Sequence, residues 1–148
     1  CEMLVRNEFE HCRRSHCNAT ILLIDIDHFK NINDTWGHDV GDKAIVALTR
    51  QLQMSVRSGD AIGRFGGDEF AVIMSQTAAE SAIAVMSRVH ERLETLSLPC
   101  APKEPLRISV GVAPWGPQFR HYREWLKAAD VALYKAKNAG RGRTEVAA

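Results

Sequence analysis

The stretch Arg64-Phe65-Gly66-Gly67-Asp68-Glu69-Phe70 places a glycine pair between two apolar runs, residues 61–65 and 70–74. Glycine adopts positive φ at no steric cost, so this pattern predicts a β-hairpin with a two-residue Gly-Gly turn. The carboxylates of Asp68 and Glu69 would then lie at the hairpin tip, where their mutual repulsion favours a bound cation. The stretch therefore indicates a site for a hard metal ion or for phosphate chemistry, with a solvated acidic turn as the simpler alternative.

A second acidic cluster directly follows an apolar run. Ile21-Leu22-Leu23-Ile24 is apolar at every position, which predicts a strand that is covered on both faces and therefore central in its sheet. If this strand lies beside the hairpin, Asp25 approaches Asp68 at one end of the sheet. These two carboxylates and the carbonyl of Ile26 supply oxygen ligands for Mg²⁺ and leave room for substrate phosphates, as two-metal phosphoryl transfer requires. We expect Asp27 to cap the next turn instead of binding metal.

The remaining patterns predict helices around this sheet. Helices are expected at residues 2–14, 39–57 with Asp39 as N-cap, 83–96 and 122–138, a strand at 106–113, and a short irregular helix within 28–37. The order helix, strand, helix, hairpin, helix, strand, helix favours an α/β sandwich, because the hairpin is too short for a parallel crossover. We expect a central mixed or antiparallel sheet of about five strands, flanked by helices.

The composition is that of one ordinary domain. The chain has 148 residues, of which 45% are hydrophobic and 25% charged, and a formal charge of +1, so residues 1–148 are expected to fold as one unit. Such a charge gives no general attraction for long nucleic acid or an anionic membrane. No apolar run reaches the ~18 residues of a membrane span. A zinc site on one helix face is disfavoured by the five-residue spacing of His11-Cys12 and His16-Cys17. No disulfide framework is expected from Cys1, Cys12, Cys17 and Cys100.

Several polar residues beside these elements suit a nucleotide. The N–H groups of a helical turn at His28-Phe29-Lys30 can hold phosphate, and the lysine adds a positive charge. Lys137 and Arg141, near the end of the last helix, can clamp a terminal phosphate, or they can simply complement the helix dipole. Asn33 and Asp42 can engage the donors of a guanine edge, or they can serve as turn and cap residues. The residues by themselves leave both alternatives open.

Taken together and in this order, the motifs resemble those of a GGDEF domain, the catalytic domain of diguanylate cyclases, over about residues 18–143. The resemblance implies a fold like the palm of polymerases and class III nucleotide cyclases. It also implies that two GTP condense to cyclic di-GMP and two pyrophosphates across the two-fold axis of a homodimer, each protomer holding one GTP. The matching segments are Asp25-Ile26-Asp27-His28-Phe29-Lys30, Asn33-Asp34, Gly37-His38-Asp39, Gly41-Asp42, residues 64–70, Ile108-Ser109-Val110-Gly111, Ala129-Asp130, Tyr134-Lys135-Ala136-Lys137 and Gly140-Arg141.

The resemblance also implies a role for each matching residue. Two Mg²⁺ or Mn²⁺ per active site would be bound by Asp25, the Ile26 carbonyl and Asp68, with Asp68 also accepting a proton. In a regular strand, Asp68 and Glu69 point to opposite faces, so the two should not share one role, and Glu69 would be a supporting catalytic group. Lys30 would stabilise charge in the transition state. The implied substrate-binding residues are His28, Phe29, Lys30, Asn33, His38, Asp42, Lys137 and Arg141.

A further match concerns regulation. Arg57-Ser58-Gly59-Asp60 resembles the family's product-inhibition site, an Arg-x-x-Asp just before the glycine signature, and Arg88 matches a secondary arginine of that site. The alternative function is a non-catalytic module that binds cyclic di-GMP or docks to a partner, but the intact signature at 66–70 favours the cyclase. The chain lacks the Asp-x-Leu-Thr segment with which the family usually opens. We therefore expect a cytoplasmic catalytic domain cut from a longer protein, whose missing N-terminal region would carry any anchor in the bacterial inner membrane.

Overall fold

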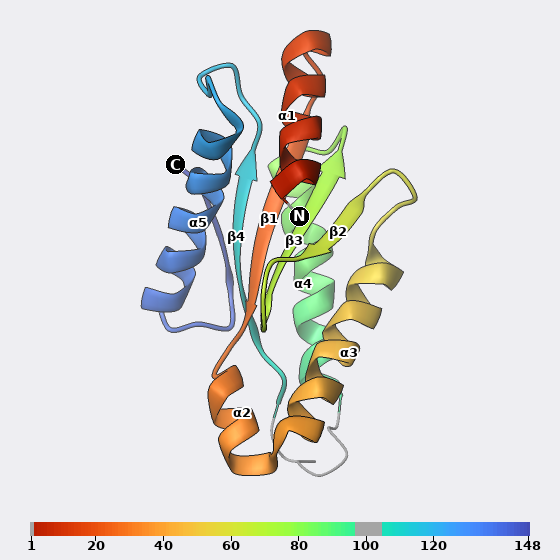
Figure 1. Ribbon diagram of the computed structural model, residues 1–148, viewed down its shortest axis with the longest axis vertical. Coiled ribbons are helices and arrows are strands. Elements are labelled where there is room, and N and C mark those ends of the chain that lie inside the picture. The colour runs from red at the N-terminus through yellow and green to blue at the C-terminus, as the bar shows by residue number, and fades with distance from the viewer. Residues whose placement is uncertain (1, 97–104) are drawn as a thin grey trace.

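The structure is a computed structural model that describes residues 2–96 and 105–148. It consists of a five-stranded sheet with helices on both faces (Figure 1). In chain order the elements are α1 (Glu2–Ser15), β1 (Ala19–Ile26), α2 (Phe29–Trp36), α3 (His38–Ser55), β2 (Ala61–Arg64), β3 (Glu69–Ser75), α4 (Ala79–Thr95), β4 (Ile108–Pro114), α5 (Tyr122–Asn138) and β5 (Thr144–Val146).

Strand β1 is central, as its unbroken apolar run predicts. The sheet order is β2-β3-β1-β4-β5, in which β1 pairs antiparallel with both β3 and β4, and β5 joins β4 in parallel. This arrangement confirms the expected α/β sandwich with a central mixed sheet. The register sets Asp25 opposite Glu69 on β3 and opposite Ser109 on β4. The acidic end of β1 therefore lies between two neighbouring strands.

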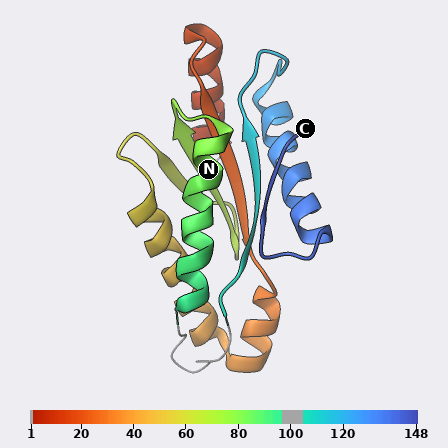
Figure 2. The ribbon, with the colours of Figure 1, turned by 180° about the vertical axis from the view of Figure 1, so that it is seen from behind.

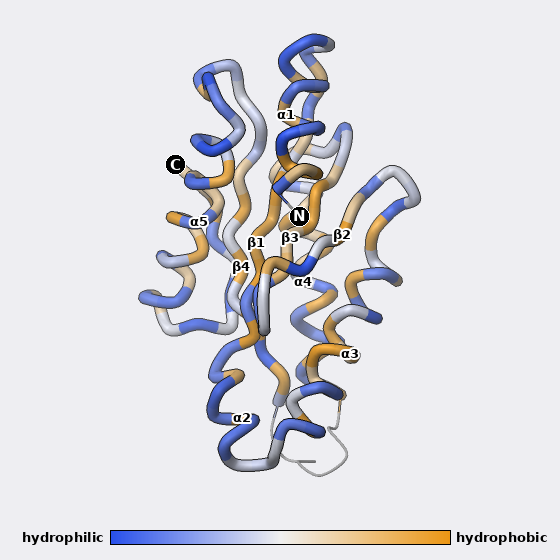
Figure 3. Tube along the Cα trace, viewed as in Figure 1, coloured by the Kyte–Doolittle hydropathy of each residue, from blue (hydrophilic) through white to orange (hydrophobic). Residues whose placement is uncertain are grey.

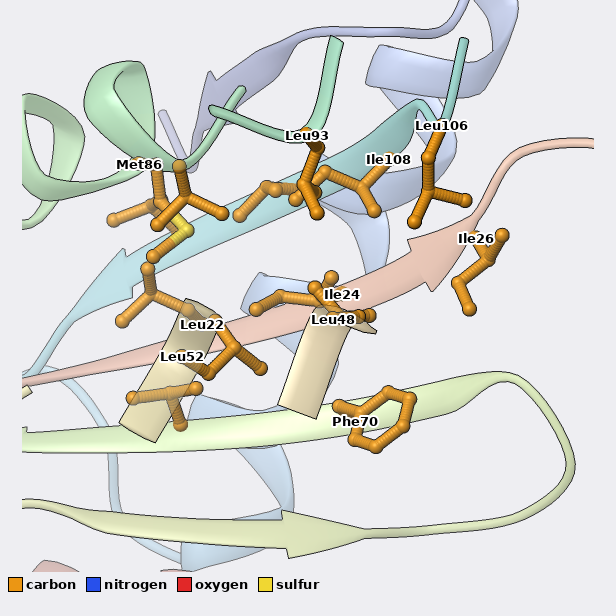
Figure 4. Packing of buried hydrophobic residues seen from close by; sticks show 14 of the residues in the cluster. Leu22, Ile24, Ile26, Leu48, Leu52, Phe70, Met86, Leu93, Leu106 and Ile108 are labelled. Carbon is orange, nitrogen blue, oxygen red and sulfur yellow. The ribbon is translucent and has the colours of Figure 1, made fainter. Parts of the chain in front are cut away.

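Two apolar layers cover the sheet (Figures 1 and 2). On one face, Leu22 and Ile24 pack with buried residues of α3 and α4 (Figure 4). On the other face, Ile21 and Leu23 pack with α1 and α5, around the fully buried Trp125. Figure 3 shows apolar residues concentrated along the strands, whereas α2 is largely hydrophilic. Every residue of α2 is at least partly exposed, and this helix lies against α3 at one end of the molecule.

The prediction of a two-residue Gly-Gly turn is wrong. The N–H of Phe65 donates to the carbonyl of Glu69 at 2.9 Å, so the turn consists of Gly66, Gly67 and Asp68. Neither glycine has the positive φ that a two-residue hairpin turn requires. The physical reason lies outside the hairpin, because the Asp68 carbonyl accepts from the N–H of Ile26 on β1 at 3.3 Å. Asp68 is thereby drawn out of β3 and toward the end of β1.

Two smaller expectations also change. Helix α3 begins at His38 with Gly37 at its N-cap, so Asp39 lies in the first turn, where its charge complements the helix dipole without capping. The fifth strand, β5, is only three residues long, and the sequence patterns had not predicted a strand at these residues. Cys100 lies outside the described residues. Within residues 2–96 and 105–148, none of the helices has the length and apolar character needed to cross a membrane.

Candidate functional site

The acidic end of β1 and the hairpin turn bring Asp25 and Asp68 together. Partial burial raises the pKa of Asp68 to about 7, and a hydrogen bond to Asp25 and the negative charge of that residue add to the shift. Asp25 is 8% exposed. Its Oδ1 atom is buried and has no hydrogen-bond partner among the described residues. Two carboxyls this close cannot both ionise cheaply unless a cation lies beside them.

Two basic side chains from the end of α5 face the same strand. The Lys137 ammonium contacts Asp25 Oδ2, and Arg141 Nη1 lies 3.8 Å from Asp27 Oδ1. Asp25 lies on β1 and Asp27 directly follows the end of that strand, and the ion pairs show that both side chains face the end of α5. Lys137 and Arg141 therefore do more than complement the helix dipole, because each is paired with one carboxylate of β1.

The chain after α5 turns sharply and fixes these basic residues. Gly140, Arg141 and Gly142 have φ values of 118°, 64° and 57°, all in the left-handed range. The N–H of Arg141 donates to the Ala136 carbonyl at 2.9 Å, and that of Gly140 donates to the Lys137 carbonyl at 3.4 Å. This is the Schellman pattern that ends helices at a glycine.

Asp27 does not cap α2, contrary to the sequence prediction. Its Oδ1 accepts a hydrogen bond from the Ser109 hydroxyl at 2.6 Å, and its Oδ2 accepts from the N–H of Gly142 at 2.7 Å. The residue that precedes α2 is His28, with φ 55°. Asp27 thus joins β1 to β4 and to the turn after α5. Sequence analysis missed this role because both partners are distant along the chain.

The residues expected to hold phosphate and base lie around α2. Lys30 is exposed and Phe29 half-buried in its first turn, and the first N–H groups of a helix have no partner within the helix. Asn33 Oδ1 is buried and lacks a hydrogen-bond partner in the described part of the chain. Gly41 of α3 makes room for it, since a Cβ at that position would overlap the Asn33 amide. The exposed Asp42 follows directly.

The remaining predicted residues, Glu69, His38 and Ile26, lie at different distances from the carboxyl pair. Glu69 is exposed and lies opposite Asp25 across the β1–β3 ladder, so it shares the face of Asp25 and Lys137. His38 is exposed at the start of α3. Ile26 is buried at the end of β1, where its N–H binds the Asp68 carbonyl. The contacts of the turn at 140–142 with Asp27, and Gly41 as the partner of Asn33, are the features that sequence analysis did not foresee.

Comparison with known proteins identifies the family. The sequence profile described as "Diguanylate cyclase, GGDEF domain" matches residues 2–143. The chain belongs to the GGDEF domain family. It is 73% identical over 147 residues to the probable diguanylate cyclase DgcC of Escherichia coli K12, a match that covers 99% of this chain and 40% of DgcC. It is 34% identical over 145 residues to the diguanylate cyclase DosC of the same strain, covering 97% of this chain and 31% of DosC. The chain thus spans 40% or less of these two relatives.

Solved structures of GGDEF domains have the same fold. The GGDEF domain of DgcB from Caulobacter crescentus in complex with c-di-GMP superposes with a TM-score of 0.91 at 26% identity, over 99% of this chain and 87% of that one. The active GGEEF domain of a diguanylate cyclase from Vibrio cholerae also gives 0.91, at 29% identity over 97% and 92% of the two chains. The resemblance inferred from the motifs is confirmed.

A second cluster of the GGDEF domain lies on the other side of the sheet from Asp25. Arg57, Asp60 and Arg88 line a cavity of about 240 Å³ between α3, β3 and α4. The Asp60 carboxylate accepts from the N–H of Arg57 at 3.0 Å and from the N–H of Ser75 at 3.2 Å. The Arg57 guanidinium donates to the Thr77 hydroxyl at 2.7 Å. The Arg-x-x-Asp segment is therefore folded back on itself and on the end of β3.

Cys12 and Cys17, the cysteines within the described residues of the GGDEF domain, make few polar contacts. Cys17 Sγ lies 3.5 Å from His11 Nε2 on the surface. Cys12 is buried in the α1 layer, and this burial raises the pKa of its thiol to about 12, with smaller contributions from Glu8 and Cys17. Across the described ranges, no group of three or more His, Cys, Asp and Glu side chains is arranged to hold a metal ion. A cation at Asp25 and Asp68 would therefore need further oxygen ligands from backbone, water or substrate.

Proposed function

We propose that this GGDEF domain is the catalytic part of a diguanylate cyclase, which condenses two GTP into cyclic di-GMP and two pyrophosphates. The observation that supports this best is the pairing of Asp25 with Asp68, because two adjacent carboxyls attract a divalent cation and leave coordination positions for phosphate oxygens. The relatives, which are named as diguanylate cyclases, support the same reaction.

The donor atoms suit Mg²⁺ or Mn²⁺. Asp25, Asp68 and the backbone carbonyl of Ile26 offer hard oxygen ligands. The Oδ1 atom of Asp25 accepts no hydrogen bond within the described structure and can therefore coordinate a cation. When bound, two such ions would supply the positive charge that polarises the α-phosphate and acidifies the attacking 3′-hydroxyl. Asp68 is the proposed acceptor of the hydroxyl proton, with Glu69 as a supporting group on the neighbouring strand.

The substrate is held from three directions in this proposal. Asn33 and Asp42 accept the N1–H and N2 donors of guanine, which adenine does not present in that form. His38 lies at the start of the same helix as Asp42. The N–H groups at His28 and Phe29 bind phosphate at the start of α2, and the basic side chains of Lys30, Lys137 and Arg141 neutralise charge on the phosphates and in the transition state.

The direct test is to incubate the purified domain with GTP and Mg²⁺ and to separate the products by chromatography. We expect cyclic di-GMP from GTP and no cyclic dinucleotide from ATP. Asp68→Ala should abolish turnover while still unfolding in one cooperative thermal transition, and Glu91→Ala, which removes an exposed carboxylate from α4, should leave turnover unchanged. Retained turnover in Asp68→Ala would remove Asp68 from the metal site.

The cavity at Arg57, Asp60 and Arg88 supports a proposed second function, inhibition by the product. An arginine guanidinium can bind both phosphate and guanine, and Arg88 lines the cavity from α4. Arg88→Ala should weaken inhibition by cyclic di-GMP about tenfold, as expected for loss of a charge-assisted hydrogen bond, with initial rates unchanged at low product. An unaltered inhibition constant would argue against this site.

The non-catalytic alternative is separated by the same experiments. A module that only binds cyclic di-GMP would bind it through the Arg57 cavity and would form none from GTP. The paired carboxyls of Asp25 and Asp68 favour the cyclase, since a receptor site at Arg57 gains nothing from them. Formation of cyclic di-GMP that depends on Asp68 would exclude the alternative.

A further inference from the structure

Asp25 and Asp27 have different surroundings. Asp25 keeps one buried oxygen without a hydrogen-bond partner among the described residues. Asp27 is 7% exposed and has both oxygens engaged, Oδ1 by Ser109 and Oδ2 by the N–H of Gly142. A carboxylate that is already filled on both oxygens is a poor metal ligand and a good anchor. The role of Asp27 therefore has to be sought in what it anchors.

We propose that Asp27 is a positioning residue, which holds the turn at residues 140–142 so that Arg141 presents its guanidinium to the phosphates of the nucleotide. This inference rests on the proposed function, in which Arg141 contacts those phosphates. Asp27 itself touches neither the nucleotide nor the metal.

The turn needs such an anchor because its backbone is strained. Arg141 has φ 64°, a left-handed conformation that costs free energy in a residue other than glycine and persists only where neighbouring contacts enforce it. On the helix side, the bond from the Arg141 N–H to the Ala136 carbonyl enforces it. On the far side, the bond from the Gly142 N–H to Asp27 does so. Asp27 thus closes the turn against the sheet.

Ser109 ties this anchor to the buried interior of the sheet. It is fully buried on β4 and lies opposite Asp25 in the ladder with the central strand. Its hydroxyl donates to Asp27 Oδ1 at 2.6 Å, so the carboxylate is fixed by a neighbouring strand as well as by its own. The position of the turn is therefore set by the sheet.

The same carboxylate leaves the guanidinium of Arg141 available. Arg141 Nη1 lies 3.8 Å from Oδ1, at the edge of ion-pair range, and the Arg141 side chain is 39% exposed while that of Asp27 is 4% exposed. A guanidinium carries five N–H donors, and one long contact does not occupy them. Asp27 attracts and orients Arg141 without neutralising its capacity to bind phosphate.

The test is a double-mutant cycle on nucleotide binding. The probes are 3′-deoxy-GTP, which lacks the attacking hydroxyl and cannot be condensed, and 3′-deoxy-GMP, which lacks the terminal phosphates. Their affinities in Mg²⁺ are measured by calorimetry or by competition for wild type, Asp27→Asn, Arg141→Ala and the double variant. Loss of one charge-assisted contact predicts that each single variant binds 3′-deoxy-GTP about tenfold more weakly, with little change for 3′-deoxy-GMP.

The decisive value is that of the double variant. If Asp27 acts through Arg141, the double variant binds 3′-deoxy-GTP no more weakly than Arg141→Ala alone. Additive losses, or a loss in Asp27→Asn that is equal for both probes, would overturn the proposal, because either would mean a general effect on the fold. If wild type binds no 3′-deoxy-GTP, the proposed function fails and this inference fails with it. If Arg141→Ala weakens binding and Asp27→Asn does not, only the inference fails.

A second variant covers the case in which Asp27→Asn does not fold. Ser109→Ala removes the hydroxyl that fixes Oδ1 and leaves the carboxylate and the turn unchanged in composition. A smaller loss, selective for 3′-deoxy-GTP and absent in the Arg141→Ala background, supports the proposal. Unchanged affinity for 3′-deoxy-GTP, together with an unchanged amide resonance of Gly142 in NMR spectra, overturns it.

Discussion

Asp25, Asp27 and Asp68 have the same side chain, but their surroundings give them different roles. Burial, together with the neighbouring Asp25 carboxyl, raises the pKa of Asp68 to about 7. Asp27 has both oxygens filled by Ser109 and Gly142. Asp68 therefore responds to pH, whereas the Asp27 carboxylate holds neighbouring segments together.

The raised pKa of Asp68 predicts a pH-dependent stability of the metal-free protein. Its ordinary pKa is 3.8 and its folded pKa about 7, so between these values the folded state binds more protons than the unfolded chain. The stabilisation is fully present below the ordinary value and is lost as pH rises through about 7. Asp68→Asn should remove this loss, and Mg²⁺ should reverse it in the wild type at alkaline pH. Thermal melts in a chelator across a pH series measure both.

His90 contributes a pH dependence of stability that is opposite to that of Asp68, so the measurement needs a control. Burial lowers the pKa of His90, which bonds Thr144 at 2.9 Å. Its contribution is therefore present above the ordinary histidine pKa and is lost as pH falls. The quantity that isolates Asp68 is the difference in melting temperature between wild type and Asp68→Asn at each pH. A difference that does not vary with pH would contradict the prediction.

Gly41 offers a residue-level test of the guanine site. A Cβ at this position would overlap Asn33 Oδ1, so in Gly41→Ala the Asn33 amide must rotate away. Because the obstacle is the end of a flexible side chain and alanine favours helix, we expect little loss of stability. We expect the KM for GTP to rise about tenfold, the effect of one misplaced polar contact, with Asn33→Ala as the matched comparison. Kinetics with GTP measure it, and an unchanged KM would mean that Asn33 does not read the base.

At the scale of elements, the hairpin shows where local sequence is insufficient. The Gly-Gly pair correctly predicts a hairpin between β2 and β3, but its turn length is decided by the bond from Ile26 on β1 to the Asp68 carbonyl. Arg64 adds a second constraint, since its Nη2 donates to the Gly67 carbonyl at 2.6 Å and its Nε to that of Gly66 at 3.1 Å. These partners keep Asp68 beside Asp25.

Removing the Arg64 constraint should therefore weaken the proposed metal site more than the fold. In Arg64→Ala the turn carbonyls lose their donor and Asp68 is no longer held in place. We expect at least about a tenfold rise in the Mg²⁺ concentration that gives half-maximal activity, as for loss of a supporting contact to a ligand. Arg64→Lys should recover only part of it, because an ammonium lacks the planar fork. Titrations of the initial rate with Mg²⁺ measure this concentration. An unchanged value in Arg64→Ala would show that the turn keeps its conformation without Arg64.

The difference between local patterns and long-range contacts also explains how much of the molecule could be predicted from sequence. Strand β1 has an unbroken apolar run and helix α5 a period-3.6 apolar pattern, and both appear at the expected residues. Asp25, Asp68 and Asn33 are recognisable from motifs. The pairing of β5 with β4 and the anchor at Asp27 depend on contacts between segments far apart in the chain, for which local patterns carry no signal.

On the scale of the whole molecule, the described elements of the chain bring together the carboxyls of Asp25 and Asp68, the proposed catalytic pair, at one end of the sheet. Cyclic di-GMP contains two equivalent phosphodiester bonds, each formed by a 3′-hydroxyl of one nucleotide and the α-phosphate of the other. Closing such a ring with one GTP per protomer requires two sites that face each other. The proposed function therefore requires a dimer, at least during catalysis.

A mixing experiment tests this requirement. In a dimer of wild type and Asp68→Ala, one site is intact, so one of the two bonds can form and ring closure is blocked. We expect the linear triphosphate-bearing dinucleotide to accumulate when Asp68→Ala is added in excess, while cyclic di-GMP falls below the level of wild type alone. Glu91→Ala added in the same excess should leave cyclic product as the main species. Chromatography of the products, together with specific activity over a range of protein concentrations, measures both effects. Activity that is independent of concentration and unaffected by Asp68→Ala would mean that a single protomer completes the reaction, and the two-fold arrangement would have to be abandoned.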